Sequence, residues 1–192
     1  MTPLFQPGVE EQPLDLCAHL IVETSRHDGD HTVHREPIRS TEGPYEGTPV
    51  GSEQNTTLLF GRVTWQMMAS YWPTAEGDIA TFMNAAPKYV FSRTLDKAEW
   101  NNTTLVKGDA VAAVKELKQQ SGKDIYVFGS ADFSATLKRH GLIDEYRIGV
   151  NPVLLGKGIP LFKDSDARVN LRLIHSRTLK SGVMIAHYEP AM

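Results

Sequence analysis

The sequence predicts an α/β domain with a mostly parallel central sheet and a C-terminal antiparallel hairpin. Short apolar runs without alternation, such as Ile125–Phe128, are typical of strands buried on both faces. Several of these runs end in small or basic residues, and helical segments follow. From Tyr146 onward, apolar and other residues alternate, which is typical of half-exposed strands in an antiparallel arrangement.

The composition is that of one domain large enough to bury a core, with 192 residues and a net charge of −3. Mixed charge of this size argues against nucleic acid as the main partner. The single cysteine, Cys17, excludes an internal disulfide framework and suits a reducing compartment. No secretory signal is visible, and no run approaches the roughly 20 apolar residues of a membrane helix. We therefore expect a cytoplasmic protein that uses neither nucleic acid nor a membrane as its partner.

Two regions differ in character. Residues 1–54 read as an irregular N-terminal arm in which only Leu16 to Val22 could form a strand, and residues 55–190 read as the main domain. The segment from Arg35 to Ser52 is rich in proline and glycine and predicts a long loop.

The arm also contains His27, His31 and His34 near two aspartates, which could be drawn as a metal site. A solvated polar loop is the favoured interpretation, because metal ligands need a rigid frame and supporting partners. We therefore expect no metal.

The main domain begins with a strand, Thr57 to Gly61, that runs into a helix from Arg62 to Tyr71, which Pro73 ends. A cation such as Arg62 in the first turn of a helix is unfavourable beside the helix dipole, and a bound anion would offset that cost. An arginine lying along the surface is an equally weighted alternative.

Three further strands follow the same pattern. Lys88 to Ser92 runs into Arg93, Thr103 to Val106 runs into Lys107 and Gly108, and Ile125–Phe128 runs into Gly129 and Ser130.

Helices are expected between and after these strands. One spans Asp78 to Ala85, and a second is capped by Asp109. A third follows Gly129, with Ser130 or Asp132 as its N-terminal cap and Gly141 at its C-terminal end.

The last fifty residues are expected to hold a strand at Tyr146 to Val150 and then a hairpin formed by residues 169–179 and 183–188. Between them, Asn151 to Gly158 is an apolar stretch leading into a glycine loop. It lacks the Gly-Lys-Ser/Thr ending of a phosphate-binding P-loop.

The carboxyl ends of parallel strands gather along one edge of a sheet, where ligands bind. The strand ends listed above bring two arginines, a lysine, two glycine turns and two helix N-termini to that edge, which predicts a site for a polyanion. An extended dinucleotide fits this spread better than a single phosphate. The GxGxxG fingerprint of ordinary dinucleotide-binding domains is absent.

Four segments of the chain resemble the bacterial dihydrofolate-reductase-like family, which includes the C-terminal reductase domain of bifunctional riboflavin biosynthesis proteins. They read LLFGRVTWQ from Leu58, YVFSRTL from Tyr89, IYVFGS from Ile125 and PVLLGKGIPLF from Pro152. The resemblance covers roughly residues 55–190. It implies a three-layer α/β sandwich of the dihydrofolate reductase type.

The resemblance also implies that the chain binds NADPH. The turn after Phe60 and the Ser-Arg turn would hold the adenosine 2′-phosphate, and the Gly-Ser turn would hold the pyrophosphate. An arginine pair suits a phosphomonoester and favours NADPH over NADH. The residues expected to bind the cofactor are Gly61, Arg62, Val63, Thr64, Ser92, Arg93, Gly129, Ser130, Ala131 and Asp132.

The region before residue 55 departs from the family pattern. Family members open with a strand that ends in a Ser-x-Asp-Gly-like turn and then a helix that closes the substrate pocket. Here the turn, Ser25 to Gly29, is one residue longer, and proline- and glycine-rich sequence replaces the helix. The acid that organises proton delivery in dihydrofolate reductases has no counterpart, so no catalytic residue is assigned. Glu23 and Asp28 are the nearby carboxylates worth testing.

The resemblance therefore implies an NADPH-dependent reductase of a small heterocyclic substrate, pterin-like or pyrimidine-like. The alternative is a non-catalytic dinucleotide-binding or dimer-forming protein that has lost the substrate wall. In either case the family and the apolar C-terminal strands lead us to expect a homodimer.

Overall fold

The computed structural model describes residues 18–24, 56–121, 124–128, 130–154, 161–162 and 168–191, with the backbone alone for residues 18–24. Eight strands form one sheet in the order β4-β3-β2-β5-β1-β6-β8-β7. The strands are β1 (Ala18–Thr24), β2 (Thr57–Gly61), β3 (Lys88–Phe91), β4 (Thr103–Val106), β5 (Ile125–Phe128), β6 (Glu145–Val150), β7 (Leu171–Thr178) and β8 (Met184–Pro190). The helices are α1 (Arg62–Tyr71), the 3-10 turn η1 (Trp72–Thr74), α2 (Asp78–Ala85), α3 (Ala110–Gln119) and α4 (Ala131–Arg139).

The strands β4, β3, β2 and β5 form the parallel half of the sheet. Its central strand β2 is buried on both faces, with Leu58 and Phe60 pointing to one side and Leu59 to the other. A strand in this position needs apolar residues at every position, which is why its sequence shows no alternation.

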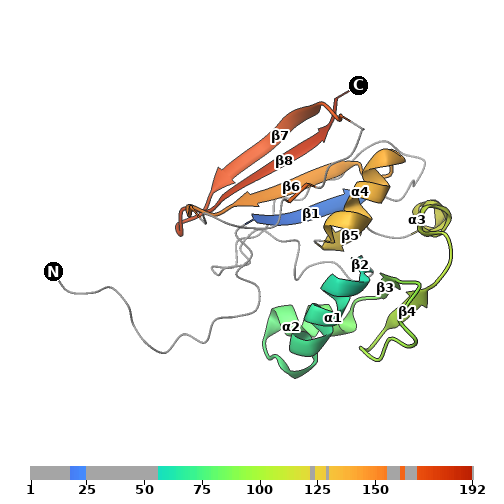
Figure 1. The fold of residues 1–192 in the computed structure, drawn as a ribbon. Coiled ribbons are helices and arrows are strands. Elements are labelled where there is room, and N and C mark those ends of the chain that lie inside the picture. The colour runs from blue at the N-terminus through green and yellow to red at the C-terminus, as the bar shows by residue number, and fades with distance from the viewer. Residues whose placement is uncertain are drawn as a thin grey trace.

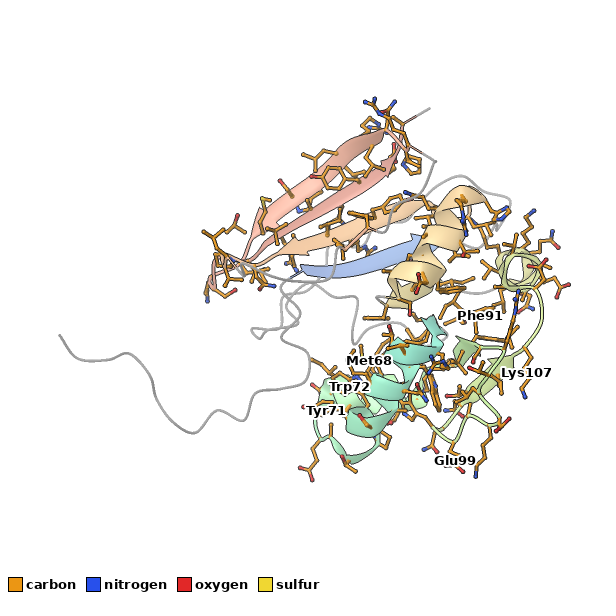
Figure 2. The ribbon with its side chains drawn as sticks, viewed as in Figure 1. Met68, Tyr71, Trp72, Phe91, Glu99 and Lys107 are labelled. Atoms are coloured by element: carbon orange, nitrogen blue, oxygen red, sulfur yellow. The ribbon has the colours of Figure 1, made fainter. Side chains whose placement is uncertain are left out.

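Helices cover both faces of this half and make three layers (Figure 1). α1 and α2 pack through Trp65, Met68 and Met83 onto the face of Phe60. Met68, Tyr71 and Trp72 lie together on that side (Figure 2). α3 and α4 pack onto the opposite face, that of Leu59. The predicted α/β three-layer fold is confirmed.

The strands β1, β6, β8 and β7 form the antiparallel half. β1 lies inside the sheet, antiparallel to both β5 and β6. It begins at Ala18, two residues later than predicted. β7 and β8 form the predicted C-terminal hairpin. The predicted boundary at residue 54 lies outside the described residues, as do His27, His31 and His34.

Two helix ends form as the sequence predicts. The Asp109 carboxylate accepts hydrogen bonds from the backbone N–H groups of Val111 and Ala112 at the start of α3. α4 ends at Arg139, and Gly141 follows its C-cap with φ of 61°, while the Leu142 N–H donates to the carbonyl of Leu137.

Lys88 at the start of β3 is fully buried and links the end of α2 to the sheet through hydrogen bonds. Its ammonium donates to the carbonyls of Met83 (2.7 Å), Asn84 (3.2 Å) and Ala86 (2.7 Å). It also lies 4.6 Å from the centre of the Trp100 ring. Burial lowers the pKa of Lys88 to about 8. Lys88 lies at the amino end of its strand, so these contacts are structural. Within the described residues, no helix is long and apolar enough to cross a membrane.

Candidate functional site

Three parallel strands end on a common row. Gly61 of β2 stands opposite Phe91 of β3, and Phe91 stands opposite Val106 of β4. On the other side of β2, Leu59 pairs with Val127, so β5 ends beside the same row. Neighbouring strands are about 4.8 Å apart, so this edge spans roughly 14 Å from β4 to β5. In Figure 2, Phe91 and Lys107 mark the ends of β3 and β4.

The chain leaves β2 and β5 toward opposite faces of the sheet. After β2 it enters α1, which packs on the face of Phe60. α4 follows β5 and packs on the face of Leu59. In open α/β sheets, such a switch point between adjacent parallel strands is where ligands bind.

Two hydrogen bonds connect the β2–α1 turn to the start of α4 at this switch point. The Gly61 N–H donates to the Ser130 hydroxyl oxygen at 2.8 Å, and that hydroxyl donates to the Thr64 hydroxyl at 2.9 Å. Gly61 is needed here, because a Cβ at this position would lie 2.8 Å from the Ser130 oxygen. Three residues of the predicted cofactor site are thereby brought together.

The sequence predicted Ser130 or Asp132 as the N-terminal cap of α4. Ser130 occupies the N-cap position, but its side chain makes no capping hydrogen bond, so the prediction is wrong for Ser130. Ser130 has φ of 57°, in the left-handed region, and its hydroxyl bonds to the β2–α1 turn instead. The bridge between two loops therefore replaces the local cap.

The helix N-termini at this edge differ in how they are capped. α3 is capped by the Asp109 carboxylate, whereas neither α1 nor α4 receives a side-chain cap. α1 also has no acidic residue in its first turn. The N-terminal N–H groups of α1 and α4 can therefore bind an anionic ligand at the switch point.

The cations predicted for the site are exposed at the same edge. Arg62 donates through Nη1 to the Gln66 side chain at 2.9 Å, which lays it along α1. Arg93 follows Ser92, whose hydroxyl accepts from the backbone N–H groups of Thr94 (3.2 Å) and Leu95 (2.9 Å) and stabilises that turn. Exposed guanidinium groups can turn toward a phosphate without the cost of being desolvated beforehand.

The remaining predicted residues fall in three groups. Val63 is 68% exposed in the first turn of α1, and Ala131 and Asp132 begin α4. Gly129 and Asp28 lie outside the described residues, and Glu23 is described only through its backbone in β1. Within the described part of the chain, no group of three histidine, cysteine, aspartate or glutamate residues could hold a metal. The cofactor role of the ten residues stays a prediction.

Sequence reasoning missed a second set of polar residues, which lies on one face of the antiparallel half. The Glu145 carboxylate accepts from Arg147 Nε and contacts His187 Nδ1, both at 2.8 Å. The Arg147 guanidinium lies over the Tyr126 ring, 5.2 Å from its centre. Burial alone would raise the pKa of Glu145, but His187 and Arg147 outweigh burial and hold it at about 2. Opposite charges two residues apart in a strand were the available signal, since such residues share a face.

The chain was compared with known proteins. A family model described as the RibD C-terminal domain matches residues 28–185. The uncharacterized protein YyaP of Bacillus subtilis (strain 168) is 35% identical over 136 residues, which are 68% of this chain and 72% of that protein. The uncharacterized protein YwjB of the same strain is 30% identical over 132 residues, 69% of this chain and 72% of that protein.

Two solved structures share the fold. A putative riboflavin biosynthesis protein from Shewanella sp. PV-4 aligns with a TM-score of 0.58 at 22% identity, over 72% of this chain and 76% of the other. A pyrimidine reductase-like protein from Corynebacterium diphtheriae NCTC aligns with a TM-score of 0.51 at 10% identity, over 72% and 77%. The fold is therefore of the reductase type, and the chain belongs to the RibD C-terminal domain family.

Proposed function

We propose that the protein is an NADPH-dependent reductase of a small heterocyclic substrate, pterin-like or pyrimidine-like. The observation that carries this proposal is the switch point between β2 and β5, where two helix N-termini without side-chain caps meet at the Gly61–Ser130 bridge. The exposed guanidinium groups of Arg62 and Arg93 lie at the same edge. Family membership supports the choice of cofactor, because the family typically binds NADPH.

The described residues fit this cofactor. Gly61 lets the backbone approach closely where a Cβ would clash, and the α1 and α4 N-termini suit phosphate oxygens. Arg62 and Arg93 would hold the 2′-phosphate, and Ser130, Ala131 and Asp132 would lie along the pyrophosphate. NADPH supplies the hydride, and the chain's residues bind and orient the reactants and exclude water.

The proposal is tested by titrating the protein with NADPH and NADH and following tryptophan fluorescence. Trp65, which is buried on the second turn of α1, reports on the site. Arg62→Ala and Arg93→Ala should each weaken NADPH binding about tenfold or more, since each loses a charged hydrogen bond, and should change NADH binding little. Arg139→Ala, at the far end of α4, is the matched control.

Equal losses for both cofactors would remove the 2′-phosphate assignment. A folded protein that binds neither nucleotide would end the reductase proposal. NADPH binding without oxidation by any pterin or pyrimidine substrate would favour the non-catalytic alternative.

We also propose that the protein works in the cytoplasm as a homodimer, formed through the apolar side chains of the antiparallel half. Val150 and Met184 are cross-strand partners, both more than 40% exposed, and Leu173 on β7 is 51% exposed. Leu173→Glu should reduce the mass measured by sedimentation equilibrium to that of a monomer. Val63→Glu, at a more exposed position on α1, should leave it unchanged.

A further inference from the structure

The polar face of the antiparallel half has the features of a ligand site. Arg147 of β6 stands opposite His187 of β8, which stands opposite His175 of β7. Cross-strand partners share a face, and the row continues through Ile21 of β1 to Phe128 at the end of β5. Because Phe128 packs with Phe60, this is the face of the sheet on which α1 lies.

His187 lies in the middle of this row with one ring nitrogen engaged and the other without a partner. The residue is only 7% exposed, and its Nδ1 is 2.8 Å from the Glu145 carboxylate. Since the pKa of Glu145 is about 2, the carboxylate is ionised at neutral pH and Nδ1 is the donor. Nε2 is buried and makes no hydrogen bond.

Arg177 also has buried hydrogen-bond donors without a partner on the same face. It stands opposite Ile185 in the β7–β8 pair, two residues from the position opposite His187, so its long side chain lies on a diagonal within reach of His187. Its Nε and Nη2 are buried and make no hydrogen bond. Buried donors of a charged group are costly when left unpaired, because they have given up their hydrogen bonds to water.

Among the described side chains, the charges around His187 are not balanced. Glu145 is engaged by Arg147 and His187, whereas Arg177 takes part in no ion pair in the part of the chain that the structure describes. A bound oxyanion would neutralise Arg177, and a guanidinium presents parallel donors that match a carboxylate or phosphate.

We propose that Arg177 and His187 form an oxyanion site for the carboxylate or phosphate group of a small molecule. The Arg177 guanidinium donates to the oxyanion, and a proton between His187 Nε2 and a second oxygen completes the contact. Because Nδ1 donates to Glu145, the proton of this contact is carried by Nε2 or by the anion.

That this molecule is the substrate rests on the proposed reductase function; the site itself does not. His187 is three strands away from Phe128, which is about 14 Å. A small heterocycle at the end of β5 that carries an anionic tail would span this distance. The site would then hold the anionic tail of such a substrate.

The test uses the full chain without NADPH. Histidine imidazole signals are followed by NMR near pH 7 while sodium phosphate, and separately sodium acetate, replaces chloride at constant ionic strength. His187 is assigned from the signal missing in His187→Gln. Its signal should move saturably with at least one of the anions, and the effective anion identifies the phosphate or carboxylate class. The described charged and titratable groups on this face are Tyr126, Glu145, Arg147, Arg172, His175, Arg177 and Glu189, of which Arg172 and Glu189 pair with each other. The signal of His175, the other histidine, is followed as well.

Arg177→Met should weaken the binding of the effective anion about tenfold or more. Arg177→Lys keeps the positive charge but loses the paired donors of the guanidinium, so its affinity for the anion should lie between those of Arg177→Met and the wild type. It also provides a test if Arg177→Met does not fold. Arg172→Met on the same strand, at a position 69% exposed, should leave binding unchanged.

Failure of His187 to respond saturably to either anion overturns the proposal, and so does an equal loss in Arg172→Met. An NADPH titration of the same samples separates the two proposals. Anion binding in a protein that does not bind NADPH removes the reductase function and leaves the oxyanion site standing.

Discussion

The two halves of the sheet place their polar chemistry differently. In the parallel half, helices cover both faces, the central strand β2 is apolar on both faces, and the candidate site lies at the strand ends. In the antiparallel half, Glu145, Arg147 and His187 lie within the strands, on one face. Parallel strands need crossover helices that bury both faces, so polar ligand-binding groups are left to the loops. Antiparallel strands joined by hairpins have no such requirement, and one face is free to hold charged side chains.

Buried charge also has a different role in each half. Lys88 in the parallel half has only backbone carbonyls as hydrogen-bond partners and fastens a helix end. Glu145 in the antiparallel half pairs with side chains that face a candidate ligand site. Replacing Lys88 and Glu145 in turn measures how much each buried charge contributes to stability and whether that contribution depends on pH.

The largest effect is expected for Lys88→Met. The carbonyls of Met83, Asn84 and Ala86 would lose their buried donor, at about 1 kcal/mol each, so the free energy of unfolding should fall by about 3 kcal/mol. Urea denaturation measures this loss, and Lys115→Met on the exposed face of α3 is the control. A loss for Lys88→Met no larger than for the control would show that the carbonyl contacts add nothing to stability.

A smaller effect, which depends on pH, is expected for Glu145→Gln. At pH 7 the variant leaves Arg147 and His187 without their carboxylate and should cost about 2 kcal/mol. The folded-state pKa of Glu145, about 2, lies below its ordinary value of 4.5, so its stabilisation is full above about pH 4.5 and is lost as pH falls toward 2.

Denaturation at several pH values checks the sign of this effect. The stability difference between wild type and Glu145→Gln should shrink as the pH is lowered from about 5 to 3. The exposed control Glu116→Gln should show no such convergence. A difference that stays constant with pH would mean that Glu145 is not held ionised by its partners.

The smallest effect is expected at the bridge between β2 and β5. Gly61→Ala places a Cβ against the Ser130 side chain and should cost about 1–2 kcal/mol. In a Ser130→Gly background the obstructing atoms are gone, so the same substitution should cost clearly less. Gly108→Ala, with no atom within 4 Å of the added Cβ, is the control. Equal costs in both backgrounds would mean that the Gly61–Ser130 contact does not hold these turns together.

Local patterns in the sequence predicted most of the parallel half. The bounds of α1 and α2, the Asp109 cap and the Gly141 end are as expected, because each depends on residues a few positions apart. The gathering of Gly61, Ser92 and Lys107 at one edge followed from the rule that parallel strands end together. That the Ser130 side chain does not cap α4 could not be predicted from a local pattern, because its hydroxyl bonds to residues 66 and 69 positions away.

By itself, the sequence determined the fold class, the family and the strand ends at which an anion can bind, since periodicity and turn residues act over short distances. Only the tertiary structure decided that β1 lies between β5 and β6, because both pairings join segments far apart in the chain. The tertiary structure also decided that Nε and Nη2 of Arg177 and Nε2 of His187 are buried on one face without a hydrogen-bond partner. Burial and hydrogen bonding at these residues depend on strand register and on the packing of distant segments, which a local sequence pattern does not contain.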